Sequence, residues 1–137
     1  MDRPPDGEGR GAVKSRGKRV DRIRLGQAGE RAAVRYLKRL GYRILEKDYR
    51  LPFAQIDVIA REEKTIVFVE VKARRSETFG LPQEAVTWRK KQRLIKAAGC
   101  YLAAKNLSDA PYRFDVVTIL YPERGRKILN LIRNAFP

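Results

Sequence analysis

The chain has 137 residues, 43% of them hydrophobic, which is enough for one domain with a modest core. It has no histidine and one cysteine, and this excludes imidazole chemistry, an internal disulfide and the usual Cys/His zinc site. The 31 Lys and Arg residues against 16 Asp and Glu residues give a net charge of +15, which favours a polyanionic partner, most commonly nucleic acid. The alternative is a basic surface that only keeps the protein soluble. Any metal would be held by oxygen ligands, which indicates Mg²⁺ or Mn²⁺.

The first 24 residues are rich in Gly, Pro, Arg and Lys and nearly free of large apolar side chains. This composition predicts a disordered basic arm over residues 1–24, followed by one domain over residues 25–137. The arm either contacts phosphates or is a solvated leader. No apolar run could span a bilayer or serve as a secretory signal, so we expect no membrane partner and a cytoplasmic location.

The residues after the arm predict an α/β fold in the order α-β-β-β-α-β, with a further edge strand. A first helix runs from Gly26 to Gly41, with apolar residues at three- and four-residue spacing. A second helix runs from Pro82 or Thr87 to Lys105. A strand that follows a long helix can rejoin the sheet by a crossover, so we expect a mixed sheet flanked by helices. The strand patterns cover residues 42–49, 55–61, 66–73 and 114–120, with the edge strand over residues 127–132.

The second and third strands should pair as an antiparallel hairpin, because only four residues separate them. With the turn centred on Glu63-Lys64, Asp57 lies opposite Glu70 on one face of the sheet. Gln55 and Lys72 form the next opposed pair on that face. Two directly opposed carboxylates, with Cβ atoms about 4.5–5.5 Å apart, can bind one divalent ion.

Without a metal the opposed carboxylates are unfavourable, because like charges destabilise a sheet and raise the pKa of one carboxyl group. Glu70 also interrupts an otherwise apolar strand. The alternative is an ordinary two-faced strand on which Glu70 and Lys72 face solvent, and spacing alone leaves the two interpretations equal. A structural interpretation also applies to Arg113 and Asp115, which share a face of their strand and form an ion pair.

Asp57 followed by Glu70-Val71-Lys72 resembles the signature of the PD-(D/E)xK nucleases, and the wider pattern resembles the YraN-like family of predicted endonucleases. The resemblance covers most of the chain. It implies a restriction-endonuclease-like mixed β-sheet flanked by helices, similar to that of archaeal Holliday-junction resolvases. The matching stretches are Gly29-Glu30, Gly41-Tyr42, Ile56-Asp57, Phe68-Val69-Glu70-Val71-Lys72, Phe79-Gly80 and Arg113-Phe114-Asp115.

The resemblance also implies roles for individual residues. Asp57 and Glu70 would be metal ligands, and Lys72 would orient or deprotonate the attacking water. Glu30 would be a further acidic residue that contributes to catalysis near the metal, and its place on the first helix, beside the buried face, permits this. The alternative for Glu30 is a carboxylate near a helix start, favoured by the helix dipole.

One position departs from the family, which usually reads Gly-Glu-Ile-Asp where this chain reads Ala54-Gln55-Ile56-Asp57. The neutral Gln55 removes any help that the family's glutamate gives to the metal or to the lysine. The departure puts catalysis, and not the fold, in doubt.

Basic residues gather at two places that could hold phosphate groups. Arg74 and Arg75 follow Lys72 at the end of the third strand, and five more cations open the second helix, where the helix dipole disfavours positive charge. A nucleic-acid surface would explain that cost, and the alternative is a solvated basic face. Trp88 either stacks on a base or anchors the helix by packing. The five helix cations are Arg89, Lys90, Lys91, Arg93 and Lys96.

These features support three functions. Intact Asp57, Glu70 and Lys72 favour a metal-dependent nuclease that hydrolyses phosphodiester bonds of DNA, with branched DNA suggested by analogy. Gln55 favours a nucleic-acid-binding module on a nuclease scaffold, with weak or lost chemistry. A basic scaffold protein without a metal site leaves the paired carboxylates unexplained. Cutting both strands of a duplex usually requires two sites, so the first function also suggests a homodimer.

Overall fold

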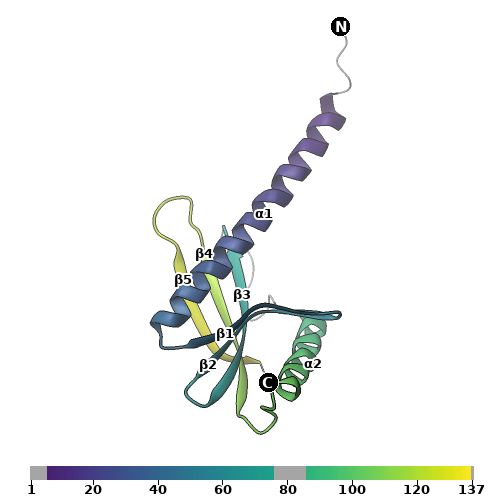
Figure 1. Ribbon diagram of the computed structural model, residues 1–137. Helices are drawn as coiled ribbons and strands as arrows, with labels where there is room; N and C mark the ends of the chain where they lie inside the picture. Colours follow the sequence, from purple (N-terminus) through teal and green to yellow (C-terminus); the bar gives the residue numbers. More distant parts are fainter. Residues whose placement is uncertain (1–5, 76–85, 137) are drawn as a thin grey trace.

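In the part of the chain that the structure describes, the fold is an α/β arrangement of one five-stranded sheet and two helices, as the sequence predicts (Figure 1). The computed structural model describes residues 6–75 and 86–136, with side chains from residue 21 onward. In chain order the elements are α1 (Asp6–Arg39), β1 (Arg43–Leu51), β2 (Ala54–Glu62), β3 (Thr65–Arg74), α2 (Trp88–Ala104), β4 (Tyr112–Leu120) and β5 (Ile128–Phe136).

The sheet has the spatial order β1-β2-β3-β4-β5, so every strand lies beside its neighbour in sequence. β3 and β4 run parallel with α2 between them in the chain, and the other neighbouring pairs are antiparallel. Parallel strands need such a crossover, because a short turn cannot bring the chain back to the starting edge. The predicted mixed sheet is therefore confirmed.

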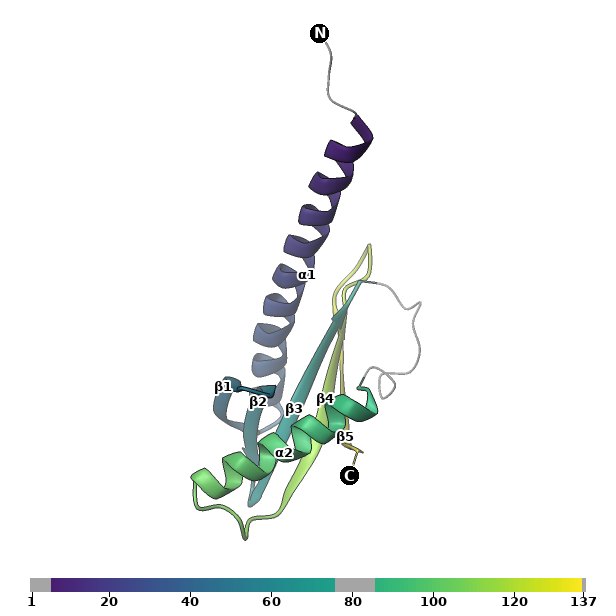
Figure 2. The same ribbon diagram turned by 90° about the vertical axis from the view of Figure 1, so that its right-hand side faces the viewer.

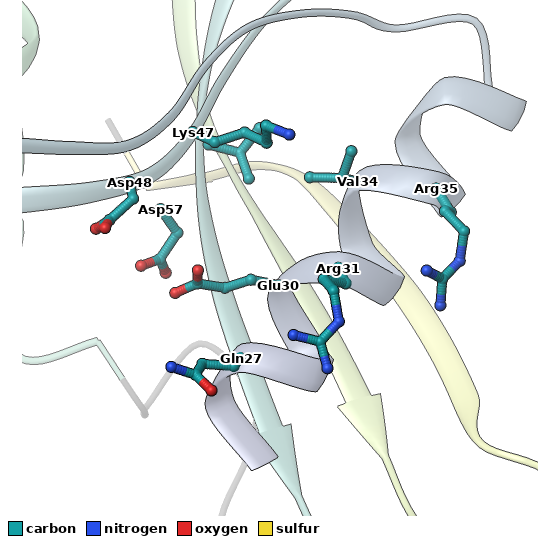
Figure 3. Close-up of a pocket in the computed structure, with 9 residues that line it drawn as sticks. Gln27, Glu30, Arg31, Val34, Arg35, Lys47, Asp48 and Asp57 are labelled. Atoms are coloured by element: carbon teal, nitrogen blue, oxygen red, sulfur yellow. The ribbon is translucent and has the colours of Figure 1, made fainter. Parts of the chain in front are cut away.

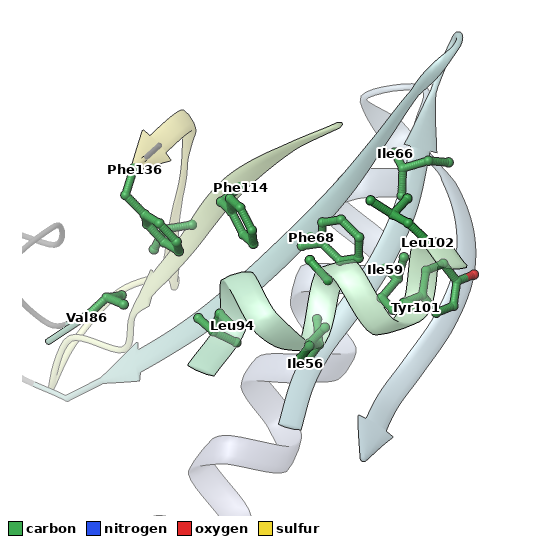
Figure 4. Close-up of a cluster of buried hydrophobic side chains, with 13 residues drawn as sticks. Ile56, Ile59, Ile66, Phe68, Val86, Leu94, Tyr101, Leu102, Phe114 and Phe136 are labelled. Atoms are coloured by element: carbon green, nitrogen blue, oxygen red, sulfur yellow. The ribbon is translucent and has the colours of Figure 1, made fainter. Parts of the chain in front are cut away.

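The two helices cover opposite faces of the sheet (Figures 1 and 2). On one face, Val34 and Leu37 of α1 pack with the β3 residues Val67 and Val69. The other face carries the larger cluster, which includes Phe68 of β3 and is covered by α2 (Figure 4). Side chains alternate between the faces of β3, as the period of a strand requires. Burying one side chain of this size stabilises the fold by about 1.5–3 kcal/mol.

A polar network connects Tyr42, which directly precedes β1, to two residues of β4. Asp115 of β4 is fully buried, and its carboxylate accepts hydrogen bonds from Tyr42 and from the Arg113 guanidinium, at 3.1 and 3.0 Å. Burial, followed by the charge of Asp115, raises the pKa of Tyr42 to about 12. Arg113 also forms an ion pair with Glu62 at 2.8 Å. The predicted Arg113–Asp115 pair is confirmed. Tyr42 and Glu62, which also contact the pair, connect β4 to the β1 and β2 segments.

Some element boundaries differ from those predicted. α1 begins at Asp6, whereas the sequence predicts a disordered arm up to residue 24. The helix extends beyond the sheet there (Figure 2), and propagating a helix already formed by packing needs no new nucleation. The division of the chain at residue 24 stays a prediction. α2 begins at Trp88 with Thr87 as its N-cap, while the alternative start at Pro82 lies outside the described residues.

Gly29 marks the point where α1 passes closest to the sheet. A Cβ atom on this residue would lie 2.8 Å from the Cβ of Ala73 in β3 and 3.4 Å from Cδ1 of Ile119 in β4. The Ala73 Cβ is attached directly to the backbone and has no flexible end that could move away. The missing side chain therefore sets the helix–sheet distance, and it does so one residue before Glu30.

Replacing Gly29 with Ala should destabilise the protein by about 1–3 kcal/mol, because overpacking outweighs the gain in helix propensity. Gly26, on the same helix, is the matched control, since nothing lies within 4 Å of a Cβ built there. Gly26→Ala should stabilise the protein by about 0.5–1 kcal/mol. Urea denaturation of both variants measures the two changes, and equal stabilisation would show that the close approach at Gly29 is not rigid.

Candidate functional site

The β2–β3 hairpin has the register that the sequence predicts. Arg61 pairs with Ile66, and the regular pairing continues as far as Val58 and Val69. Beyond that pair the two strands part, so Gln55 has no partner on β3 and the predicted Gln55–Lys72 pairing is wrong. Where the strands separate, a side chain replaces the backbone as the hydrogen-bond acceptor. Asp57 Oδ2 accepts a 2.8 Å hydrogen bond from the backbone N–H of Val71. The bond fixes the Asp57 carboxyl group at the end of the paired strands.

The carboxyl groups of Asp57 and Glu70 lie together at this separation point. Glu70 is buried, with 7% of its surface exposed. Burial, followed by the hydrogen bond and negative charge of Glu70, raises the pKa of Asp57 from its ordinary value of 3.8 to about 8. The Val71 N–H opposes this change but does not outweigh it. Two carboxyl groups held this close favour a state in which the pair shares a proton, and the half-buried Asp57 is the member whose pKa rises.

Two lysines surround the carboxyl pair. Lys72 lies two residues after Glu70 on β3, and burial, followed by the charge of Lys90, lowers its pKa. Lys90 comes from α2, and its Nζ lies 3.1 Å from Glu70 Oε2. Burial disfavours the charge on Lys90, but Glu70, together with Lys72 and Asp57, outweighs burial and raises the pKa of Lys90. The sequence predicts Lys90 as a contact to nucleic acid, and the structure brings it to the carboxyl pair.

Replacing Lys90 with Ala should destabilise the metal-free protein by about 1–2 kcal/mol, since the buried Glu70 carboxylate loses its cation. Arg93 lies one helical turn further along α2 and borders the same pocket as Lys90 and Glu70, but it is exposed. Arg93→Ala is thus the matched control, with an expected change within about 0.5 kcal/mol. Urea denaturation in a chelating buffer provides the measurement. Equal losses in the two variants would contradict a specific Lys90–Glu70 pair.

Glu30 reaches the same region from α1. It borders a pocket of about 550 Å³ together with Asp48 and Asp57, and the three carboxyl groups gather on one side of that pocket (Figure 3). Burial, then the charge of Asp48 and, more weakly, that of Glu70 raise the pKa of Glu30, against the charge of Arg50. The position of Glu30 agrees with a helix carboxylate that contributes charge to the site.

Asp48 is a site residue that the sequence reasoning missed. In the β1–β2 hairpin Lys47 pairs with Val58 and Tyr49 pairs with Ile56, so Asp48 lies across from Asp57. Its backbone has a φ of +52°, an uncommon conformation that Asp tolerates better than most residues. A hairpin with its turn centred on Pro52-Phe53 would have predicted that Asp48 lies opposite Asp57.

Gln55 contacts Asp48 rather than Lys72. Its side-chain amide donates a hydrogen bond to the Asp48 carboxylate, which also forms an ion pair with Arg50 at 3.1 Å. A carboxylate is therefore present beside position 55, although Gln55 itself is neutral. Four successive elements, α1, β1, β2 and β3, supply the carboxyl groups of Glu30, Asp48, Asp57 and Glu70.

The other predicted nucleic-acid contacts fall into distinct environments. Lys91 and Lys96 lie over the rings of Phe136 and Phe53, at 5.6 and 4.5 Å from the ring centroids. Trp88 is 72% exposed, so the interpretation of this residue as a packing anchor is wrong. The remaining positions are at the surface or near it: Arg74 is half-buried at the end of β3, and Arg75, Arg89 and Arg93 are exposed.

The donor set suits a hard divalent cation. Glu70 Oε2 is buried and has no hydrogen-bond partner among the described residues, so its contact with Lys90 is an ion pair without an aligned hydrogen bond. An oxygen of this kind beside a second carboxyl group is a ligand type that Mg²⁺ and Mn²⁺ prefer. Within residues 6–75 and 86–136, no three Asp, Glu or Cys side chains converge closely enough to bind one ion. Asp57 and Glu70 are thus the pair that could hold a metal, with Glu30 outside the ligand set.

The fold and the site define a basic α/β domain with a carboxyl pair, one member buried and the other half-buried, and two lysines where two strands of its sheet separate. In the part of the chain that the structure describes, neither helix is both long and apolar enough to cross a bilayer.

The chain belongs to the uncharacterised protein family UPF0102, whose family model matches residues 29–119. It is 46% identical over 116 residues to a UPF0102 protein of Geotalea daltonii, and the match covers 85% of this chain and 91% of that protein. A UPF0102 protein of Pelobacter propionicus is 42% identical over 138 residues, covering 99% of this chain and 97% of the relative. The matched range includes Glu30, Asp48, Asp57, Glu70 and Lys72. The predicted YraN-like family membership is therefore confirmed.

Proposed function

We propose that this protein is a metal-dependent nuclease that hydrolyses phosphodiester bonds, with DNA as its substrate and a fold of the restriction-endonuclease type. The observation that carries the proposal is the contact between the Asp57 and Glu70 carboxyl groups, next to Lys72 and Lys90. That arrangement is costly to the fold, and cations clustered around paired carboxyl groups suit a phosphate that must meet a metal. The net charge of +15 supports a polyanionic substrate.

Each residue has a role in the proposed reaction. Asp57 and Glu70 would hold the Mg²⁺ or Mn²⁺ ion, which when bound polarises the phosphate and makes water more acidic. Lys72 would orient the attacking water or accept its proton. Lys90 and Arg93 stabilise negative charge that develops on the phosphate oxygens. Glu30 and Asp48 add negative charge that favours binding of the cation.

A second function has one observation in its favour. No third carboxylate of the described residues joins Asp57 and Glu70 closely enough to complete a ligand set, and Lys90 already neutralises Glu70. A nucleic-acid-binding module without chemistry would keep the same basic surface and the same fold. Metal affinity separates the two functions, because only the nuclease requires it.

The test is Mg²⁺ and Mn²⁺ binding by calorimetry, together with cleavage of single-stranded, duplex and branched DNA. We expect binding and metal-dependent cleavage by the wild type, and neither by Asp57→Ala/Glu70→Ala. The wild-type substrate preference would also test the analogy to branched DNA. No metal binding by the wild type, with or without DNA, would exclude the nuclease and leave the binding module.

A further inference from the structure

Three cations border the acidic pocket on the α1 side of the sheet. Arg31 and Arg35 come from α1 and Lys47 from β1, and all three line the pocket of about 550 Å³ that Glu30 and Asp57 also line (Figure 3). The phosphate contacts that the sequence predicts in the folded domain lie at the end of β3 and the start of α2. These three residues are therefore a second basic group, on the other side of the carboxyl site.

The three cations are exposed and have no polar partner in the described part of the chain. None of them forms a side-chain hydrogen bond or an ion pair there, although carboxylates line the same pocket. Arg31 and Arg35 are four residues apart, so they lie on one face of α1, where like charges repel and destabilise the helix. An anion from outside the chain would remove that cost.

Asp57 connects this pocket to the one on the α2 side. It lines both pockets, and the second, of about 410 Å³, is also lined by Glu70, Lys90 and Arg93. A phosphate placed at Asp57 would thus have cations on both sides, from α1 and β1 on one side and from α2 on the other. A chain of regularly spaced phosphates would bring negative charge to both groups of cations at once.

We propose that Arg31, Arg35 and Lys47 bind the phosphates of a nucleic-acid strand on the α1 side of Asp57, while the α2 cations hold the strand on the other side. The strand then passes Asp57 where β2 and β3 separate. The inference rests on the proposed function for the identity of the occupant. Its chemistry is the phosphodiester backbone, which DNA and RNA share, and such contacts fix the position of a strand without reading its sequence.

The experiment measures binding in a chelating buffer, where no cleavage can occur. Fluorescence anisotropy follows a labelled single-stranded DNA oligonucleotide, and an RNA oligonucleotide of the same sequence, over a series of salt concentrations. The variants are Arg31→Ala/Arg35→Ala and Lys47→Ala. The control is Lys64→Ala/Lys105→Ala, which removes the same charge as the double variant from exposed positions in the β2–β3 turn and at the end of α2.

We expect Arg31→Ala/Arg35→Ala to weaken binding about tenfold or more at low salt. The salt slope should fall by about 0.7 for each phosphate that the variant no longer neutralises. Lys47→Ala should reduce the slope by about half as much, and the control should keep the wild-type slope. Weaker binding of both oligonucleotides identifies a backbone site, and weaker binding of one identifies the nucleic acid that the site accepts. Either result supports the proposal.

Three results would overturn the inference: no binding by the wild type, an unchanged slope in the double variant, or equal losses in the double variant and the control. The last would mean that net charge alone attracts the strand. A protein that binds through Arg31 and Arg35 but never cleaves with Mg²⁺ or Mn²⁺ would refute the nuclease and retain this site. A protein that cleaves while the double variant binds normally would refute this site and retain the nuclease.

Discussion

Single replacements of Asp57, Glu70 or Lys72 should abolish phosphodiester cleavage while the protein stays folded. Asp57→Asn is the sharpest of them, because the amide oxygen can still accept the hydrogen bond from Val71 and only the ionisable oxygen is lost. Activity should fall by at least about 10²–10³-fold, the loss typical of removing one preorganised electrostatic contact to a transition state. Lys72→Met should lose a similar amount, because the attacking water is no longer held.

The control variants make the same type of substitution, Asp to Asn and Lys to Met, at residues away from the site. Asp109→Asn and Lys105→Met alter exposed residues between the end of α2 and the start of β4, and both should keep wild-type activity. Circular dichroism and urea denaturation show whether each variant is folded. Undiminished cleavage by the Asp57, Glu70 and Lys72 variants would remove the carboxyl pair from any catalytic role.

The metal-free protein should become less stable as the pH rises from about 4 to about 8. Asp57 has a pKa of about 8 in the folded protein against an ordinary value of 3.8, so over this interval the folded state holds a proton that the unfolded state has released. The stability that Asp57 contributes is complete below the lower value and is lost as the pH passes the higher one. The loss should be on the order of a few kcal/mol, and Asp57→Asn should be free of it.

Urea denaturation in a chelating buffer, at several pH values across that interval, measures this effect. The informative quantity is the difference in stability between the wild type and Asp57→Asn, because titratable groups away from the site contribute equally to both. Adding Mg²⁺ or Mn²⁺ should stabilise the wild type more at high pH than at low pH, since the metal must displace the proton. Parallel pH profiles for the two proteins would show that Asp57 does not titrate in this range.

The parts of the fold that the sequence predicts well are those governed by local rules. The β2–β3 register follows from a short turn and from strict alternation of side chains, and it held as far as Val58 and Val69. The contact between Asp57 and Glu70 follows from the same two rules. The buried face of α2 follows a local rule too, since Leu94, Ala98 and Tyr101 are buried and recur at three- and four-residue spacing.

The parts that were missed depend on contacts between distant segments. Lys90 meets Glu70 only because the crossover returns α2 over β3, and no local pattern contains that distance. Arg31 and Arg35 resemble any solvated cations on a helix until β1 and β2 form the other wall of their pocket. The predicted pairing of Gln55 with Lys72 was also wrong, because β2 and β3 separate beyond Val58. Gln55 instead contacts Asp48.

The hydrogen bond from Val71 to Asp57 gives the site a spectroscopic reporter on the main chain. The Val71 amide proton points at the carboxyl group whose protonation, metal binding and substitution matter most. Its NMR chemical shift should move with each of these events, and its exchange with solvent should slow or quicken as the bond tightens or breaks. The state of the carboxyl pair can therefore be read from one backbone resonance, before any substrate is known.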